Sequence, residues 1–300
     1  MFEGREESDL DPEAGEAAFR DRFVVTADGL RLHFRDYAGA SGKLPLLCLH
    51  GLTRNARDFA AFAEDYSPAR RVIALDFRGR GMSDYDPLPA RYTPMTYAAD
   101  VIVLLDQLAI ERAVFVGTSL GGLVTMTLAA MAPQRIAGAI LNDIGPEMSA
   151  EGLERIGSYV GKGGPFATWD EAADTLAGIN GNAHPNYSHD DWVKMARRVC
   201  RQGQGRIVFD YDRGIALPFQ TKGPAPRVDL WPLFRALAEK PLLVVRGELS
   251  DLLSAAALQK MHEAAPNMKS VTVLGVGHAP TLSEPDAVSA IDAFLAGLSR

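Results

Sequence analysis

The sequence predicts an α/β fold: a mostly parallel, doubly wound β-sheet covered by helices on both faces, with an inserted helical cap. Two observations predict this fold. Short apolar runs alternate with amphipathic stretches of helical length, which is the pattern of parallel strands connected by helices. The alternation then stops between residues 142 and 241, where no convincing buried strand can be found. A length of 300 residues suits one large α/β domain that carries such an insertion.

The fold is expected to open with two antiparallel strands. The runs 23–26 and 30–37 flank Ala27-Asp28-Gly29, which is a typical hairpin turn. The remaining strands are expected at six short apolar runs, namely 46–49, 72–75, 113–116, 136–141, 242–245 and 271–274. Helices are expected at 56–66, 96–108, 120–131, 254–265 and 285–298.

These elements divide the chain into three parts. Residues 1–21 form an acidic tail, residues 22–145 and 237–300 form the sheet-and-helix core, and residues 146–236 form the cap. The cap is rich in aromatic residues and contains all three tryptophans. We expect these aromatic side chains to form the small core of the cap itself, and the alternative is that they wall a substrate pocket.

Composition and charge exclude several classes of function. The formal net charge is −7, of which the first 20 residues carry −5 and the remaining 280 only −2. A near-neutral body without a basic surface argues against a nucleic-acid partner. No apolar run is long enough to span a bilayer, and the acidic N-terminus is unlike a signal peptide, so we expect a cytoplasmic protein without a membrane partner. The two cysteines, Cys48 and Cys200, are too few for a disulfide framework.

The strongest chemical signal is the sequence Gly117-Thr118-Ser119-Leu120-Gly121. It lies between an expected strand and an expected helix, which is the setting that a nucleophile elbow requires. In such an elbow the serine adopts a strained backbone conformation and its hydroxyl stands clear of the sheet. A side chain at either glycine would collide with neighbouring backbone. Ser119 is therefore the predicted nucleophile.

A serine hydroxyl needs a base, and the base needs a carboxylate that holds its tautomer. His278 is the predicted base, because it follows the last expected strand at the carboxyl edge of the sheet. Asp251 and Glu248 both lie in the loop after the strand at 242–245, and Asp251 is the predicted carboxylate because it lies deeper in that loop and just precedes a helix. Asp143, directly after the strand at 136–141, is the alternative.

The backbone N–H groups of Leu120 and Leu52 are predicted to form an oxyanion hole, one after the nucleophile and one after the first parallel strand. Arg54 and Asn55, in the same loop as Leu52, are possible substrate contacts. His50 is expected to hydrogen-bond its own loop. A metal site formed by His50 and His278 has no acidic or cysteine partner at ligand spacing, so we predict no metal.

The order Ser119, Asp251, His278, together with the His50-Gly51 loop and the segment 76–84, resembles the α/β-hydrolase fold superfamily. The most similar branch contains the cap-bearing esterases, lactonases and carbon–carbon bond hydrolases. The resemblance implies an eight-stranded sheet with one antiparallel strand and a pocket between sheet and cap. Haloalkane dehalogenases and epoxide hydrolases of this fold use an aspartate nucleophile, whereas position 119 is serine.

We therefore predict a serine hydrolase that needs no cofactor and cleaves an ester, lactone or related carbonyl substrate through an acyl-enzyme. Its expected partner is a small-molecule substrate, and the expected state is a monomer or homodimer. A carbon–carbon bond hydrolase of ring-cleavage products, a cofactor-free haloperoxidase and a non-catalytic ligand receptor on the same fold are the alternatives. The short basic run with Arg197, Arg198 and Arg201 is interpreted as a solvated helix side.

Overall fold

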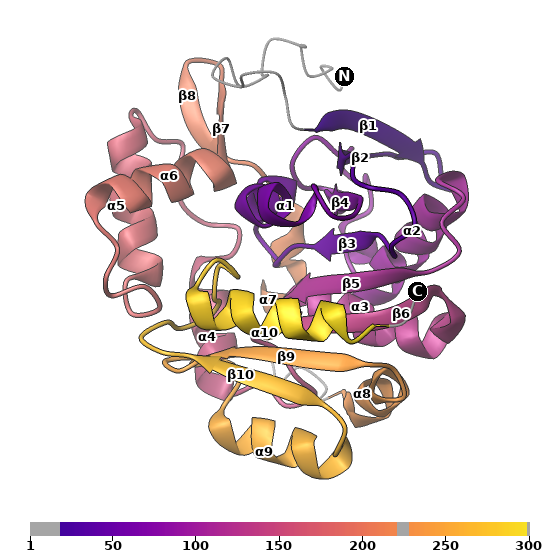
Figure 1. The fold of residues 1–300 in the computed structure, drawn as a ribbon. Helices are drawn as coiled ribbons and strands as arrows, with labels where there is room; N and C mark the ends of the chain where they lie inside the picture. The colour runs from indigo at the N-terminus through magenta and orange to yellow at the C-terminus, as the bar shows by residue number, and fades with distance from the viewer. Residues whose placement is uncertain (1–18, 221–227, 299–300) are drawn as a thin grey trace.

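The computed structural model describes residues 19–220 and 228–298. Within these ranges one sheet of eight strands has the order β1-β2-β4-β3-β5-β6-β9-β10 (Figure 1). β2 is antiparallel to both of its neighbours, and the other pairs are parallel. The predicted fold class is confirmed. The strands are β1 (Arg20–Val25), β2 (Arg31–Tyr37), β3 (Leu46–Leu49), β4 (Val72–Leu75), β5 (Ala113–Thr118), β6 (Ile136–Asn142), β9 (Leu242–Gly247) and β10 (Lys269–Val273).

The helices form two layers, one on each face of the sheet (Figure 1). They are α1 (Ala60–Tyr66), α2 (Pro94–Gln107), α3 (Leu120–Met131), α8 (Trp231–Ala238), α9 (Ala255–Ala264) and α10 (Pro285–Ala296), with the 3₁₀ turns η2 (Ala56–Phe59), η3 (Pro89–Arg91) and η4 (Pro133–Arg135). Each face has its own core because successive strand residues point to opposite sides. In β3, Leu47 and Leu49 pack with α2, α3, α8 and α9, whereas Leu46 and Cys48 pack with α1 and α10.

The register of the central strands determines where the site lies. β3, β5, β6 and β9 are neighbours, and Leu49 pairs with Gly117, Thr118 with Asn142, and Asn142 with Val245. These parallel strands therefore end at the same edge of the sheet. The loops that follow them are brought side by side although they are far apart in the sequence.

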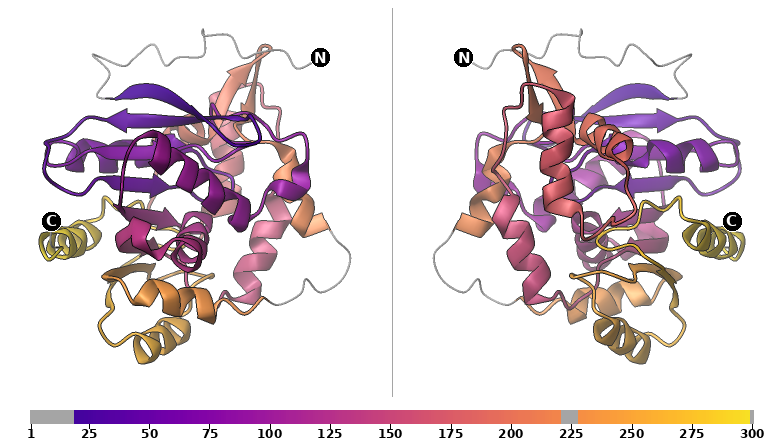
Figure 2. Two further views of the ribbon diagram at one scale, coloured as in Figure 1. Left: turned by 90° about the vertical axis from the view of Figure 1, so that its right-hand side faces the viewer. Right: turned by 90° about the vertical axis from the view of Figure 1, so that its left-hand side faces the viewer.

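The segment between β6 and α8 lies over this edge as a cap (Figure 2). It contains α4 (Ala150–Tyr159), α5 (Trp169–Asn180), α6 (His189–Val199), the hairpin of β7 (Cys200–Gly203) and β8 (Arg206–Phe209), η5 (Arg213–Ala216) and α7 (Leu217–Gln220). A third apolar cluster, which includes Phe166 and Trp192, packs α5 and α6 against the hairpin. The third tryptophan, Trp231, opens α8, which crosses the expected end of the cap and packs with α3 on the core.

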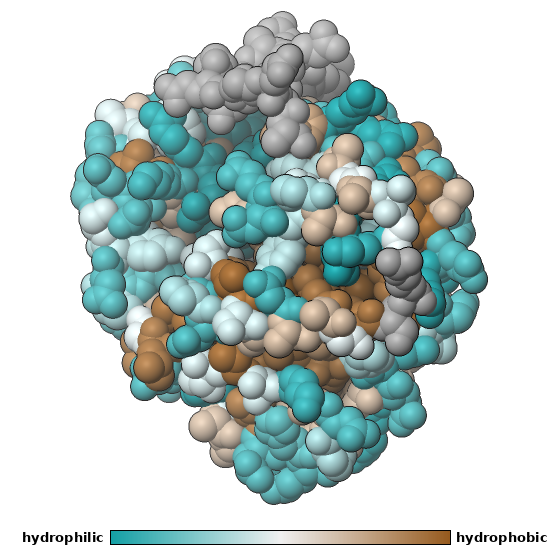
Figure 3. Space-filling model, in the orientation of Figure 1, coloured by the Kyte–Doolittle hydropathy of each residue, from teal (hydrophilic) through white to brown (hydrophobic). Residues whose placement is uncertain are grey.

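The acidic tail predicted for residues 1–21 falls almost entirely outside the described residues, and β1 already begins at Arg20. Figure 3 shows a mainly hydrophilic face, on which hydrophobic side chains gather around α10 where this helix covers the sheet. Within the described ranges, no helix combines the length and the apolar character that crossing a membrane would require.

Candidate active site

Ser119 lies at the sharp turn between β5 and α3 and has φ 51° and ψ −114°. This left-handed φ is strained for a residue with a side chain. Both flanking glycines are required by close packing. A Cβ at Gly121 would lie 1.9 Å from the carbonyl oxygen of Leu49, and one at Gly117 would lie 2.6 Å from the backbone of Gly121. The strained geometry expected of the elbow is present.

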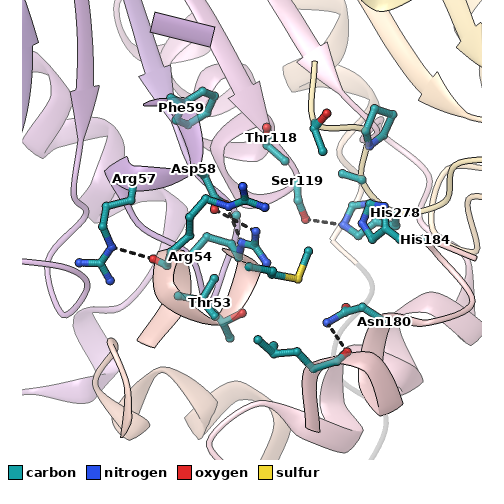
Figure 4. A pocket seen from close by; sticks show the side chains of 18 of the residues that line it. Thr53, Arg54, Arg57, Asp58, Phe59, Thr118, Ser119, Asn180, His184 and His278 are labelled. Carbon is teal, nitrogen blue, oxygen red and sulfur yellow. Dashed lines mark hydrogen bonds and ion pairs between the residues drawn. The ribbon is translucent and has the colours of Figure 1, made fainter. Parts of the chain in front are cut away.

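The side chain of His278 joins Ser119 to Asp143 (Figure 4 shows the contact with Ser119). Nδ1–H of His278 donates to Oδ2 of Asp143 at 2.7 Å. Nε2 then carries the lone pair and accepts the Ser119 hydroxyl proton at 3.0 Å. The geometry permits Nε2 to take the serine proton while the carboxylate stabilises the positive charge on the ring.

Asp143 follows the last residue of β6 and is completely buried. Besides His278, its carboxylate accepts hydrogen bonds from the backbone N–H of Gly247 at 2.8 Å and from the hydroxyl of Ser250 at 2.6 Å. Its own N–H donates to Val245 at 2.7 Å. The last residue of β9 and the loop that follows it thus supply one donor each, and the two donors fix the orientation of the carboxylate.

Asp251 was the predicted partner of His278, and the structure corrects this prediction. Its carboxylate forms a two-point ion pair with Arg155 of α4, in which Nη2 lies 2.9 Å from Oδ1. Its carbonyl oxygen also accepts a hydrogen bond from Ser149, which begins α4. Burial tends to raise the pKa of Asp251, but Arg155 outweighs burial and the pKa is lowered. Asp251 therefore ties the cap to the core, and the alternative, Asp143, occupies the predicted position.

The loop after β3 passes directly beside the nucleophile. A Cβ at Gly51 would lie 3.8 Å from Cβ of Ser119. Among the described residues, no acceptor takes a hydrogen bond from the N–H of Leu52 or of Leu120. Both N–H groups are free to donate to an oxyanion, and the N-terminus of α3 adds its partial positive charge.

His50 has a structural position, as expected. Its Nδ1–H donates to the carbonyl oxygen of Gly51 at 2.7 Å, and its Nε2 accepts the N–H of Phe77 at 3.1 Å. Burial lowers its pKa to about 4, so the ring is neutral at physiological pH. Its ring therefore connects the loop after β3, which contains Leu52, to the loop after β4, which contains Phe77.

A cavity of about 530 Å³ opens beside Ser119 and His278 and is lined by both the core and the cap. Each of the two interpretations of the cap aromatics, a core of the cap itself and a wall of a pocket, holds for different residues. Phe166 and Trp192 pack in the cap's own core, whereas Tyr159 and Tyr187 line the cavity. Within the described part of the chain, no three His, Cys, Asp or Glu side chains are placed to hold a metal ion.

Of the two predicted substrate contacts, Arg54 lines the cavity and Asn55 does not. Arg54 lines the cavity and forms a two-point ion pair with Asp58, with distances of 2.5 and 2.9 Å (Figure 4). Asn55 is only 1% exposed and is not part of the lining. Its Oδ1 accepts the N–H of Arg57, and its Nδ2 donates to the carbonyl oxygen of Arg198. The prediction that Asn55 contacts substrate is therefore corrected, because both ends of its amide hold the protein together.

The basic run lies at the end of α6 and the start of β7, and its interpretation as a uniformly solvated helix side is corrected. Arg197 lies over the Trp169 ring at 5.0 Å, and Arg201 lies 3.4 Å from Asp210. Arg198, in contrast, lines the cavity. Nothing in the spacing of the three arginines indicated this difference, because it depends on how α6 packs over the loop after β3.

Comparison with known proteins shows which family the chain belongs to. The model of the alpha/beta hydrolase family matches residues 46–291. The chain belongs to the alpha/beta hydrolase family. It is therefore a hydrolase, and the resemblance seen in its motifs is confirmed.

Individual relatives agree with this assignment. A solved alpha/beta hydrolase from Novosphingobium aromaticivorans is 51% identical, with a TM-score of 0.89 over 94% of this chain and 99% of that one. The 3-hydroxybutyrate-oligomer hydrolase of Cupriavidus necator is 32% identical over 89% of this chain and 93% of its own length. The 2-(acetamidomethylene)succinate hydrolase of Mesorhizobium japonicum is 32% identical over 79% of this chain and 82% of its own length.

Proposed function

We propose that this alpha/beta hydrolase cleaves carboxylic esters through an acyl group carried by Ser119. The observation that carries the proposal is the hydrogen-bonded series Ser119, His278, Asp143, with distances of 3.0 and 2.7 Å between the bonded atoms. Nucleophile, base and orienting carboxylate come from three different loops at one edge of the sheet. This is the arrangement that activates a serine for acyl transfer.

The reaction proceeds in two halves. Oγ of Ser119 attacks the ester carbonyl carbon while its proton passes to Nε2 of His278. When the tetrahedral intermediate collapses, that proton passes to the leaving alcohol oxygen and the acyl group stays on Ser119. A water molecule then attacks the acyl carbon, again giving its proton to His278, and the carboxylic acid leaves as Ser119 recovers its proton.

We expect the N–H groups of Leu52 and Leu120 to stabilise the negative oxygen of each tetrahedral intermediate. Leu120 is the first residue of α3, and Leu52 lies in the loop that follows β3 beside Ser119. Asp143 keeps the proton of His278 on Nδ1, and the hydrogen bonds from Gly247 and Ser250 orient its carboxylate.

The substrate we propose is a short hydroxy-acid ester. The relative from Cupriavidus necator is named a 3-hydroxybutyrate-oligomer hydrolase, and an oligomer of this hydroxy acid is joined by ester bonds. A cavity of about 530 Å³ is large enough for a short oligomer.

The proposal is tested with the purified protein and four substrates: 4-nitrophenyl butyrate, the 3-hydroxybutyrate dimer, a γ-lactone and a ring-cleavage product. We expect ester hydrolysis that is lost in Ser119→Ala, and a fluorophosphonate should label wild type at Ser119 only. Preferred cleavage of the ring-cleavage product, or ester hydrolysis that survives in Ser119→Ala, would contradict the proposal.

A further inference from the structure

Three arginines line the cavity, and two of them are already neutralised. Arg54 is paired with Asp58. Arg57 is paired with Asp210 at 2.9 Å. Arg198 also lines the cavity, but none of the described residues accepts a hydrogen bond from its guanidinium or forms an ion pair with it. Among the described residues, Arg198 is therefore the arginine of the cavity lining that has no carboxylate bound to it.

The backbone of Arg198 is held firmly against the core. Its carbonyl oxygen accepts hydrogen bonds from Nδ2 of Asn55 and from Nε of Arg57, both at 2.8 Å. Met195 and Val199, on either side of it in α6, are buried in the core of the cap. The start of the Arg198 side chain is thus fixed relative to the loop that carries Leu52, and a change of its head group leaves both backbone contacts in place.

The neighbours of Arg198 cannot supply the missing negative charge. Asp58 feels the charge of Arg198, but its two oxygens are engaged by Arg54. Burial, together with Arg54 and Arg198, lowers the pKa of His184 to about 4, so this ring is neutral. Glu64, the other carboxylate of the lining, is exposed and forms no ion pair or hydrogen bond with Arg198. A partly buried guanidinium in this setting is stabilised by an anionic ligand.

We propose that Arg198 binds a carboxylate of the substrate, so that the preferred substrates are esters that also carry a free acid group. A guanidinium presents paired N–H donors that match the two oxygens of a carboxylate. The class includes half-esters of dicarboxylic acids and short hydroxy-acid oligomers with a free acid end. This inference rests on the proposed ester hydrolysis and adds to it the chemical group that determines specificity.

The test compares acidic esters with neutral esters of the same shape. In the first pair, mono-4-nitrophenyl glutarate carries the carboxylate on the acyl side, and 4-nitrophenyl 5-methylhexanoate replaces it with an isopropyl group. In the second pair, 3-acetoxybutyrate carries the carboxylate on the alcohol side, and its amide is neutral. For at least one pair, wild type should have a kcat/KM about 10- to 100-fold higher for the acid than for its neutral partner.

Arg198→Gln should lower this acid-to-neutral ratio at least about tenfold, and Arg198→Lys should retain part of it. Arg197→Gln is the matched control, because it removes the same charge from the adjacent residue, whose side chain lies over Trp169. It should leave the ratio unchanged. A ratio near one in wild type for both pairs, or an equal fall in Arg197→Gln and Arg198→Gln, would overturn the inference.

A binding measurement separates this inference from the proposed function. Calorimetry with Ser119→Ala measures the affinities for mono-4-nitrophenyl glutarate and for 3-acetoxybutyrate without turnover, and the double variant Ser119→Ala, Arg198→Gln should bind at least one of these acids at least about tenfold more weakly. Equal affinities would refute the role of Arg198 even in an active esterase. If neither neutral nor acidic esters are hydrolysed, the proposed function fails, while the binding result still decides the role of Arg198.

Discussion

The hydroxyl of Ser250 donates a hydrogen bond of 2.6 Å to Oδ2 of Asp143, which is 107 residues earlier in the chain. The same carboxylate oxygen accepts Nδ1–H of His278. The loop after β9, which the sequence suggested as the source of the orienting carboxylate, instead supplies groups that orient a carboxylate from the neighbouring strand. The assignment of Asp143 as the partner of His278, and of Asp251 as the partner of Arg155, can be tested directly.

Asp143→Asn should lower kcat about 10⁴-fold, because the amide cannot stabilise the imidazolium and favours the wrong histidine tautomer. Asp251→Asn is the matched control. It weakens the ion pair with Arg155 but leaves His278 and its partners in place, so kcat should fall less than about tenfold. The measurement is steady-state hydrolysis of a 4-nitrophenyl ester. The assignment is wrong if Asp251→Asn is the more damaging change.

Ser250→Ala should reduce kcat about tenfold with little change in KM, because the carboxylate loses one of the donors that orient it. Ser250→Thr keeps the hydroxyl and should restore most of the rate. Ser250 also accepts hydrogen bonds from Leu252 and Leu253, so thermal stability is measured for both variants. A rise in KM with unchanged kcat would instead indicate a purely structural role in the loop.

His33 predicts a pH dependence of stability far from the candidate site. It lies between Asp21 and Asp76, with a 2.7 Å contact to each carboxylate. Burial lowers its pKa, but hydrogen bonds to both carboxylates outweigh burial and raise the pKa to about 9 from an ordinary value of 6.5. Because the folded pKa is raised, the stabilisation is complete below pH 6.5 and is lost as the pH rises to about 9.

The free energy of unfolding of wild type should therefore fall by roughly 3 kcal/mol more than that of His33→Gln between about pH 6 and about pH 9. Urea unfolding at the two pH values measures both proteins, and titratable groups that do not interact with His33 cancel in the difference. Parallel pH profiles for the two proteins would show that His33 does not gain its charge on folding.

Arg78 is buried among three carboxylates, those of Asp28, Asp86 and Asp100. Arg78→Met should destabilise the fold by about 3–5 kcal/mol, because it leaves buried negative charges without their cation. Arg91→Met removes an exposed arginine that also contacts Asp28, and it should cost less than about 1 kcal/mol. Urea unfolding compares the two variants. Similar losses of unfolding free energy in the two variants would contradict the claim that burial makes the ion pairs of Arg78 matter more than that of Arg91.

Local patterns predicted the eight strands of the main sheet and the strand–turn–helix setting of Ser119, but not the β7–β8 hairpin inside the cap. The structure also places His278 beside Ser119, as expected from its position after the last strand. Local patterns could not decide between Asp143 and Asp251. Both aspartates follow strands that end at the same edge, and only the packing of Arg155 against Asp251 turns the latter toward the cap. The position of Arg198 likewise depends on contacts with Asn55 and Arg57, which lie more than a hundred residues away in sequence.

The central claim is that Ser119 carries the acyl group during turnover. The most direct measurement is mass spectrometry of peptides from the protein quenched in acid during hydrolysis of 4-nitrophenyl butyrate. We predict a butyryl group on the peptide that contains Ser119, its absence in Ser119→Ala, and its accumulation when His278→Ala slows deacylation more than acylation. A butyryl group on another residue would contradict the account. So would a wild-type protein that stays unmodified and hydrolyses the ester no faster than Ser119→Ala.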